Sequence, residues 1–261
     1  MPNRREVDMA QPGWLVLAGL GWAMAGSAVA GDCAMLRPNA DLSGCDYSRQ
    51  SLAGKDLRGV RLVGAKLENT DLQRADLSGA DLSGANAKWA RFQGARLVKA
   101  KLKNADLFHA IFDRADLQEA DLSGAYLFGA NLIDTSARGA DFSRAYLKDI
   151  LMEGIDLSGG SIKDCYAFRG VMIGAKLVGT DLSGADLTGA AADNADLSGA
   201  RLKGTRLAGA TLRFADFSRA DLQGADFAHA DVWNASFDKT FNRPASLTEA
   251  LAEVFTGSAK P

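Results

Sequence analysis

Large hydrophobic residues recur at every fifth position through most of the chain. Leu or Phe occupies most positions whose numbers end in 2 or 7, from Leu42 to Phe237, and Ala occupies most of those that end in 0 or 5. A period of five fits neither one face of a helix nor the alternation of a strand. It predicts a chain that turns a corner every five residues. The large residue and the small residue two positions before it point inward, and the other three residues point outward.

Four of these units close one square coil, so every twentieth residue lies on the same side of the molecule. Neighbouring coils then form backbone hydrogen bonds at the ~4.8 Å spacing of adjacent strands. The period runs without net insertion over residues 40–239, which predicts about ten coils and a rod roughly 48 Å long. The pattern therefore predicts an all-β solenoid in which each coil is stabilised mainly by its two neighbours.

The repeat units themselves point to a family. The chain reads ADLSG at 75–79 and again at 80–84, and ADFSR at 140–144. Such units resemble those of the pentapeptide-repeat family, and the resemblance covers residues 40–239. It implies a right-handed quadrilateral β-helix, with Leu or Phe at the central position of each unit (position i) and Ala at position i−2. The resemblance implies an architecture, and fold alone does not imply function.

The last residues are expected to cover the C-terminal end of the rod. Ser246 and Glu249 match a capping box. Four hydrophobic residues follow at the spacing of one helical face, namely Leu247, Leu251, Val254 and Phe255. We predict a short helix over 246–256, with Phe241 nearby, inside a C-terminal helical cap and tail at 240–261.

The N-terminal end is expected to be less regular. Residues 31–39 form a cap segment before the first coil. Tyr47, Gln50 and Lys55 occupy inward positions that they fit poorly. The sequence therefore predicts a frayed first coil beneath the cap segment.

The three cysteines are expected to form one disulfide. Cys33 and Cys45 are twelve residues apart, and we predict that they pair in an oxidising compartment. Cys45 and Cys165 both occupy i−2 positions, but they are six coils or ~29 Å apart, which is too far for a disulfide. Cys165 is then a buried free thiol in place of Ala. The alternative is three unpaired thiols.

Residues 1–30 have the layout of a secretory signal peptide. Arg4 and Arg5 lie in a short polar start, an apolar run follows at 13–25, and Ala28 and Ala30 are the small residues that precede a cleavage site. We predict cleavage after Ala30, which places the mature chain in a bacterial periplasm or outside the cell, with no stable membrane anchor. The alternative is an uncleaved anchor, but the run is shorter than the roughly 20 residues that span a bilayer.

The sequence offers little for catalysis. It contains two His and three Cys, and Asp precedes the large residue on every face, which we interpret as part of the repeat rather than as acid–base or calcium chemistry. His109 and His229 lie on the same face but six coils apart, so they cannot share a metal or a proton. We therefore expect no catalytic residue, no cofactor, no metal and no enzymatic activity.

The charge is balanced. The formal net charge is −2, and each of the four sides carries acidic and basic residues in similar numbers, so we expect no nucleic acid partner. Some members of the pentapeptide-repeat family, which this chain resembles, mimic duplex DNA and bind DNA gyrase. A cytoplasmic gyrase-binding protein of that kind is the alternative function here. It requires residues 1–30 to stay inside the cell, and this chain lacks the acidic stripe.

Outward-pointing aromatic residues, by contrast, gather on one side. They form the aromatic face: Trp89, Phe108, Tyr126, Phe128, Tyr146, Tyr166 and Phe168. The next side adds aliphatic residues over the same coils: Ile111, Ile133, Leu151, Val171 and Ile173. Together they predict an exposed apolar patch on the order of 500 Å², which is large for a monomer. Atypical inward residues between Ile150 and Gly170 could distort the end of this patch.

The patch has two interpretations. It is a docking surface for a protein partner, a second copy of the chain or a sugar polymer that stacks on the rings, or it only stabilises the stack of coils, as cross-strand aromatic pairs do in sheets. The sequence as a whole predicts an exported, non-enzymatic rod that acts as a scaffold or protein-binding module in the cell envelope.

Overall fold

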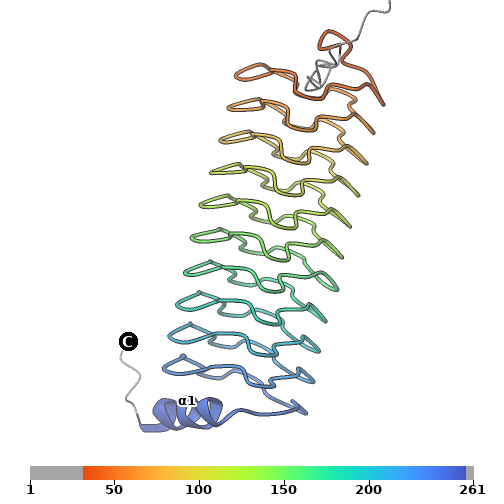
Figure 1. Ribbon diagram of the computed structural model, residues 1–261. Helices are drawn as coiled ribbons and strands as arrows, with labels where there is room; N and C mark the ends of the chain where they lie inside the picture. Colours follow the sequence, from red (N-terminus) through yellow and green to blue (C-terminus); the bar gives the residue numbers. More distant parts are fainter. Residues whose placement is uncertain (1–31, 257–261) are drawn as a thin grey trace, which may run out of the picture.

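The molecule is a rod of stacked coils (Figure 1). The computed structural model describes residues 32–256, and the expected signal peptide lies outside the described residues. Parallel bridges join residues that are twenty apart, from Asp41 with Arg61 to Asp221 with Phe241. One bridge occurs in each five-residue unit, so four units make one coil. The predicted all-β fold of stacked coils, with a helix at its C-terminal end, is confirmed.

Each corner of a coil is a tight turn held by the repeat itself. At the first one, the Cys45 N–H donates a hydrogen bond to the Leu42 carbonyl (3.2 Å), and Gly44 has the positive φ (69°) that the third residue of such a turn needs. The Asp41 carboxylate accepts a hydrogen bond from the Ser43 N–H (3.1 Å). The Asp of the repeat therefore fixes the corner, as Asx turns do.

The core is narrow: each coil contributes four large side chains, mostly Leu and Phe, with Ala at the corners. Leu42 is fully buried at one end, and Phe92 and Phe112 lie fully buried in successive coils. The Phe92 and Phe112 rings are parallel, with centroids 4.6 Å apart. Where Thr135 takes the place of a corner Ala, its hydroxyl donates to the Phe112 carbonyl (3.0 Å), so this buried polar group is satisfied.

Helix α1, Ala245–Thr256, covers the C-terminal end of the rod. Leu247 and Ala250 are buried against the last coil, and Leu251 and Val254 pack on the core, whereas the Phe255 side chain lies outside what the structure describes. Within residues 32–256 no helix has the length and apolarity needed to cross a bilayer.

The expected capping role of Ser246 is wrong. The helix begins one residue earlier, so Ser246 lies in its first turn rather than before it. Its hydroxyl accepts a hydrogen bond from the Phe227 N–H (3.1 Å) and donates one to the Ala225 carbonyl (3.3 Å). These bonds attach the helix to the coil beneath it.

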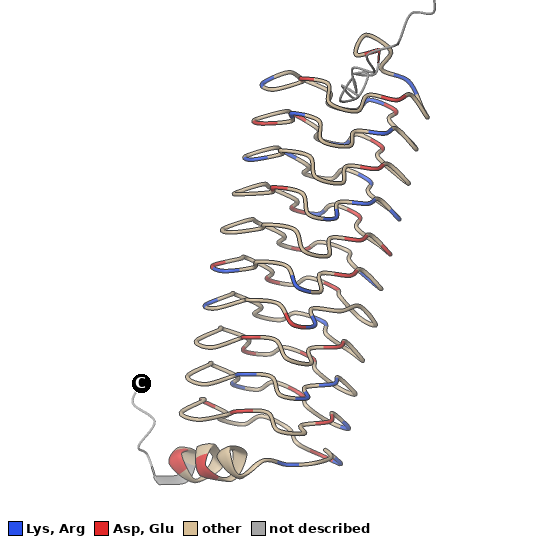
Figure 2. Ribbon diagram, in the orientation of Figure 1, with Lys and Arg blue, Asp and Glu red and all other residues tan. Residues whose placement is uncertain are grey.

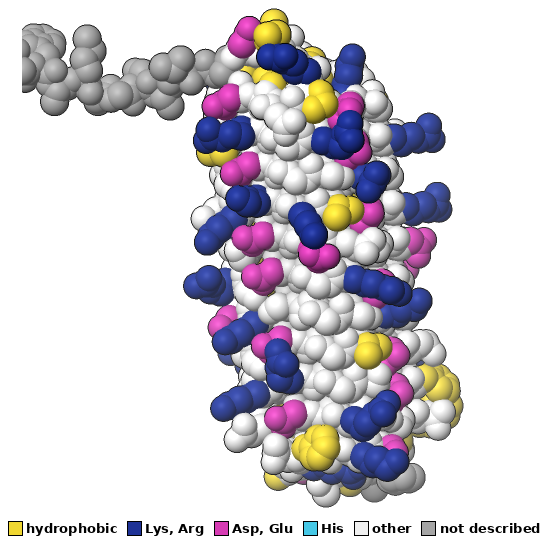
Figure 3. Space-filling view, turned by 90° about the vertical axis from the view of Figure 1, so that its right-hand side faces the viewer, with side chains coloured by type: hydrophobic (Ala, Val, Ile, Leu, Met, Phe, Trp, Pro, Cys, Tyr) yellow, Lys and Arg dark blue, Asp and Glu magenta, His cyan; other side chains and the backbone are white. Residues whose placement is uncertain are grey.

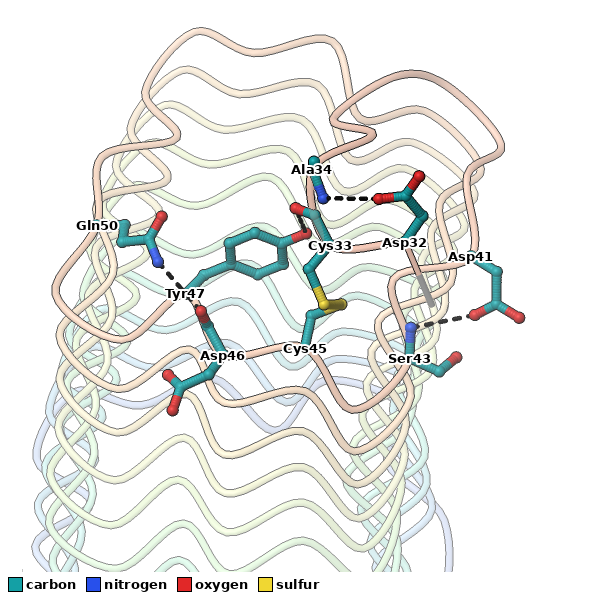
Figure 4. Close-up of a disulfide and its surroundings, with 9 residues drawn as sticks. All are labelled: Asp32, Cys33, Ala34, Asp41, Ser43, Cys45, Asp46, Tyr47 and Gln50. Carbon is teal, nitrogen blue, oxygen red and sulfur yellow. Dashed lines mark hydrogen bonds between the residues drawn. A yellow bond between two sulfur atoms is a disulfide. The ribbon is translucent and has the colours of Figure 1, made fainter. Parts of the chain in front are cut away.

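A disulfide closes the N-terminal end. Cys33 and Cys45 are bonded, with Cα atoms 5.6 Å apart. Tyr47 lies beside the disulfide, and its hydroxyl donates to the Cys33 carbonyl (2.9 Å) (Figure 4). Gln50 and Lys55 are exposed, but the bridges already begin at Asp41. The expected frayed first coil is therefore wrong, because the disulfide segment covers the Tyr47 ring.

The coils keep their register through the irregular units. Ile150, Ile155 and Cys165 are buried, and bridges still join Tyr146 to Tyr166. The backbone is therefore not distorted here, but the Tyr146 and Tyr166 ring planes differ by 34°, against 17° for Tyr126 and Tyr146, so the ring at this end of the patch is turned. Cys165 is a free buried cysteine, and burial raises the pKa of its thiol to about 12, so it stays protonated and unreactive near neutral pH.

Gly160 is the exception among the corner residues, because Ala does not fit there. A Cβ at Gly160 would lie 2.6 Å from the Ala140 carbonyl oxygen, whereas a Cβ at Gly170 would come no closer than 3.2 Å to its neighbours. We expect Gly160→Ala to lower the free energy of unfolding by about 1–3 kcal/mol through overpacking, although Ala is the usual residue of the repeat. Urea unfolding measures this, with Gly170→Ala as the matched control. Equal effects of the two substitutions would contradict the expectation.

Candidate docking surface

The aromatic face forms a continuous set of ring contacts across five coils. Trp89 packs edge-on against Phe108, with centroids 5.2 Å apart. Phe108 stacks with Phe128 at 5.6 Å and lies 6.3 Å from Tyr126. Tyr126, Tyr146 and Tyr166 then form a column with spacings of 5.0 and 5.2 Å, and Phe168 stacks beside Tyr166 at 6.1 Å. The structure thus brings together all seven aromatic residues singled out in the sequence.

The rings cover one another's faces. The planes of Phe108 and Phe128 differ by 8°, and those of Tyr126 and Tyr146 differ by 17°. These near-parallel rings therefore point their edges outward, whereas Tyr166 is tilted by 34° from Tyr146 and Trp89 packs edge-on against Phe108. A sugar needs an uncovered ring face to stack on, so the stacked Phe108, Phe128, Tyr126 and Tyr146 rings are a poor platform for a sugar polymer.

The phenol hydroxyls of the Tyr column face solvent. Within residues 32–256, no hydrogen bond uses the hydroxyls of Tyr126, Tyr146 or Tyr166, and none of these oxygens is among the buried unsatisfied atoms. Tyr126 itself is 40% exposed. The face therefore offers a row of hydroxyls spaced about one coil apart, flanked by apolar ring edges.

The aliphatic residues lie on the adjoining side, over the same coils. Leu151 and Val171 are bridged neighbours, but Asn131 separates Leu151 from Ile111. Only Ile173 among them is strongly exposed, at 40%. Ile111, Ile133, Leu151 and Val171 are partly buried. The aliphatic row therefore broadens the apolar surface less than the sequence suggested.

His109 and Lys148 also belong to this surface, although the sequence did not lead us to include them in the patch. The His109 ring lies edge-on to Phe108, with centroids 4.3 Å apart, and its Nδ1 lies 3.1 Å from the Gly129 carbonyl oxygen. The Lys148 ammonium lies over the Phe128 ring, 5.7 Å from its centroid, so it adds a cation–π contact. The twenty-residue period could have placed both residues on this surface. Lys148 is twenty residues after Phe128, and His109 is twenty residues before Gly129, so each lies directly above or below its partner in the next coil.

A second, smaller aromatic pair lies on another side near the C-terminal end. Phe214 and Trp233 pack edge-on, with centroids 4.8 Å apart, and they are 46% and 50% exposed. No ring contact within residues 32–256 links this pair to the aromatic face. It therefore serves as a natural control for experiments on that face.

Charges on the rod neutralise one another along its axis. Arg61, Arg91 and Arg201 each form an ion pair with an Asp twenty residues earlier, in the preceding coil. Acidic and basic residues accordingly intermingle along the coils (Figure 2) and over the surface seen in Figure 3. No acidic stripe of the kind that imitates DNA is visible on that surface.

The tightest of these axial pairs joins Arg206 to Asp186, 2.5 Å apart. Burial alone would raise the pKa of Asp186, but hydrogen bonds from Arg206 and Thr188 outweigh it and hold that pKa below its usual value. Asp186 is therefore ionised at neutral pH and lies in the column directly after Tyr166, to which it is bridged. The Tyr column is thus followed, in the next coil, by the Asp186 carboxylate, whose negative charge is neutralised by Arg206.

The described residues bring together little that could do chemistry. Within residues 32–256, no group of three or more His, Cys, Asp or Glu side chains is placed to hold a metal ion. His229 lies 3.4 Å from Glu253 of the capping helix, far from His109. The feature that stands out among the described residues is the aromatic face.

Comparison with known proteins agrees with this architecture. The family model of pentapeptide repeats matches eight copies, at residues 51–86, 88–124, 120–159, 171–204 and 205–241. The chain belongs to the pentapeptide-repeat family. Members of this family are generally structural or binding proteins rather than enzymes. A comparison with the curated proteins gives no match.

Solved structures similar to this pentapeptide-repeat protein include proteins of a cyanobacterium, a plasmid and a plant. HetL, a pentapeptide repeat protein involved in heterocyst differentiation regulation in the cyanobacterium Nostoc, is 28% identical, with 78% of this chain and 87% of HetL covered and a TM-score of 0.49. QnrB1, a plasmid-mediated fluoroquinolone resistance protein, is 19% identical, with 86% and 99% covered and a TM-score of 0.44. A pentapeptide repeat protein of the Arabidopsis thaliana thylakoid lumen is 26% identical, with 53% and 75% covered and a TM-score of 0.24.

Proposed function

We propose that this protein is an exported, non-enzymatic rod that binds another protein chain through its aromatic face, as a scaffold or docking module of the cell envelope. The observation that carries the proposal is the continuous ladder from Trp89 to Phe168, in which Trp89 and Tyr126 are 42% and 40% exposed. Aromatic residues, Tyr and Trp above all, are enriched where proteins bind one another.

The disulfide supports the export part of the proposal. Cys33 and Cys45 are bonded, and disulfides persist in oxidising compartments rather than in the cytosol. The bond lies immediately after the segment expected to be removed as a signal peptide. A chain that folds with this bond fits the periplasm or the extracellular space.

Photo-crosslinking tests the docking part directly. Tyr126 is replaced by p-benzoylphenylalanine, which keeps an aromatic side chain at that position, and the same replacement of Trp233 is the matched control on the smaller aromatic pair. After illumination of intact cells, we expect a discrete adduct with a second protein chain from position 126 and none from position 233. Equal adducts from both positions, or none from position 126, would contradict the proposal.

A further inference from the structure

We propose that a depression on another side of the rod, the side that precedes the aromatic face in each coil, binds a tetrahedral oxyanion, that is, a phosphate or sulfate group. The depression has a volume of about 380 Å³ and is lined by Lys103, Asn104, Ser123, Gly124 and Arg144. It spans three successive coils, and none of its residues belongs to the aromatic face. The inference therefore goes beyond the proposed function and is tested separately from it.

The Ser123 hydroxyl is the first sign of a ligand. Within residues 32–256, six polar or charged side chains are buried, and Ser123 is one of them at 6% exposure. Four are threonines whose hydroxyls donate to carbonyl oxygens, and Asp186 accepts hydrogen bonds from Arg206 and Thr188. Ser123 alone uses only its backbone, with its N–H on the Asp121 carboxylate (2.9 Å). A buried hydroxyl without a partner calls for a bound group at that position.

The hydroxyl opens into the depression. Ser123 lines it, and the Ser123 oxygen is not among the fully enclosed polar atoms that lack a partner. It is therefore within reach of a small ligand, although the side chain as a whole is covered by its neighbours.

The two cations of the lining are also unpaired. Arg201, elsewhere on the same side, pairs with Asp181 in the preceding coil at 3.0 Å. Lys103 instead has serines before and after it in its column, and Arg144 has Gly124 before it. Within residues 32–256 neither Lys103 nor Arg144 forms an ion pair, so both charges are available to a ligand.

No acidic side chain lines the depression. Asp164 follows Arg144 in its column, but its carboxylate leans away from the depression, over Gly184 in the coil beyond. Asp121 lies around the corner, in the column of Lys101, to which it is bridged. The lining thus carries two positive charges that only an anion from outside would neutralise.

Gly124 provides the space. It lies between Asn104 and Arg144 in one column, and the Asn104 carboxamide occupies the place that a Cβ at Gly124 would need. Within the described part of the chain the Asn104 side chain makes no hydrogen bond, so its amide nitrogen is a further donor. The depression therefore offers an ammonium, a guanidinium, a hydroxyl and an amide.

This set of donors fits a tetrahedral oxyanion better than a carboxylate. The donors come from three coils that are ~4.8 Å apart, so they approach a ligand from different directions. A phosphate or sulfate group has oxygens on every side, whereas a carboxylate has two oxygens in one plane. Guanidinium groups bind oxyanions through paired hydrogen bonds, and lysine adds a compact positive charge.

Titration of the isotope-labelled wild-type protein with inorganic phosphate, followed by the nuclear magnetic resonance signals of its backbone amides, tests the site. At constant ionic strength we expect saturable shifts centred on Ser123 and Gly124, with a Kd in the millimolar range or below, and similar shifts with sulfate. Acetate should bind at least about ten times more weakly, because it leaves a charged donor without an acceptor. Shifts spread over the lysines and arginines of the whole rod, or equal binding of acetate, would overturn the inference.

Two substitutions in the lining test the donors. Lys103→Gln should weaken phosphate binding at least about tenfold, and Ser123→Ala should weaken it several-fold while the fold stays intact. The matched control is Lys203→Gln, which removes a charge from the same column five coils further on, where Lys203 forms no ion pair within residues 32–256. Equal effects of Lys103→Gln and Lys203→Gln, or unchanged binding by Ser123→Ala, would contradict the site.

A third variant blocks the depression without changing its charge. Gly124 has a φ of +67°, and Asn is already accepted at this corner, as Asn104 shows with a φ of 54°. Gly124→Asn should therefore fold normally and lose most of its phosphate binding. Gly204→Asn is the matched control, because Gly204 has a φ of +65° in the same column and no atom lies within 4 Å of an added Cβ. Wild-type binding by Gly124→Asn, with an unchanged circular dichroism spectrum, would overturn the inference.

Glycerol phosphate distinguishes the two sources of the group. Tighter binding of glycerol phosphate than of inorganic phosphate would assign the depression to the end group of a larger molecule. Equal or weaker binding would assign it to the free ion. Saturable binding of neither compound would overturn the site, and the photo-crosslinking result at Tyr126 would be unaffected.

Discussion

Replacing Phe112 with alanine is expected to lower the free energy of unfolding by about 3–5 kcal/mol. The Phe112 side chain is fully buried, and its ring lies parallel to that of Phe92 at 4.6 Å. Fully buried side chains of the same coil, such as Leu107 and Leu117, pack around Phe112, and bridges to the neighbouring coils hold the backbone, so the coil cannot collapse into the cavity. Urea unfolding monitored by circular dichroism measures the change.

Phe237→Ala is the matched control for that substitution. Phe237 stacks on Phe217 with centroids 5.0 Å apart, but it belongs to the last coil and is 8% exposed. Water and the capping helix can fill part of its space, and the last coil can open without the rest of the rod. We expect less than half the loss seen at Phe112. Equal losses would show that the rod does not behave as a sum of neighbouring coils.

Removing the disulfide is expected to be the second large effect. The double variant Cys33→Ser/Cys45→Ser should lose about 2–4 kcal/mol of stability, as loops of this length do when their crosslink is cut. The loss should be local, because the bond holds residues 33–45 over Tyr47 and the first coil. Hydrogen exchange should therefore accelerate around residues 40–60 and stay slow at the centre of the rod.

Cys165→Ala provides the control for the loss of a cysteine as such. Cys165 is buried at a corner position where the repeat usually has Ala, so this variant should fold with nearly unchanged exchange everywhere. Fast exchange throughout the rod in the double variant would contradict a local role of the disulfide. Unchanged exchange near residues 40–60 would show that the cap needs no crosslink.

The architecture could be predicted because it depends on a short, repeated pattern. Every unit places a large side chain such as Leu77 and a small one such as Ala75 inward, and a slip of one residue would expose all of them. Register is strongly specified in such a chain, and the structure keeps it even at Ile150 and Cys165. The membership of the aromatic face followed from the same period, because residues twenty apart share a side.

Features that depend on contacts between segments were harder to predict. The Ser246 hydroxyl bonds to Ala225 and Phe227 rather than to its own helix, and a local capping pattern holds no information about that coil. Tyr47 appeared too large for an inward position, but the bonded Cys33 segment covers it. The orientation of the rings, which decides whether faces or edges reach solvent, depends on side-chain rotation that the period does not encode.

The measurement that tests the central claim most directly is the intact mass of the protein isolated from fractionated cells. The account predicts a chain that starts at Gly31, found in the periplasm or the medium, with the mass of one disulfide and one free thiol. A chain that retains Met1 in the cytoplasm with three free thiols would contradict it. A gyrase supercoiling assay would then be the next experiment, because the balanced rod would share the compartment of gyrase.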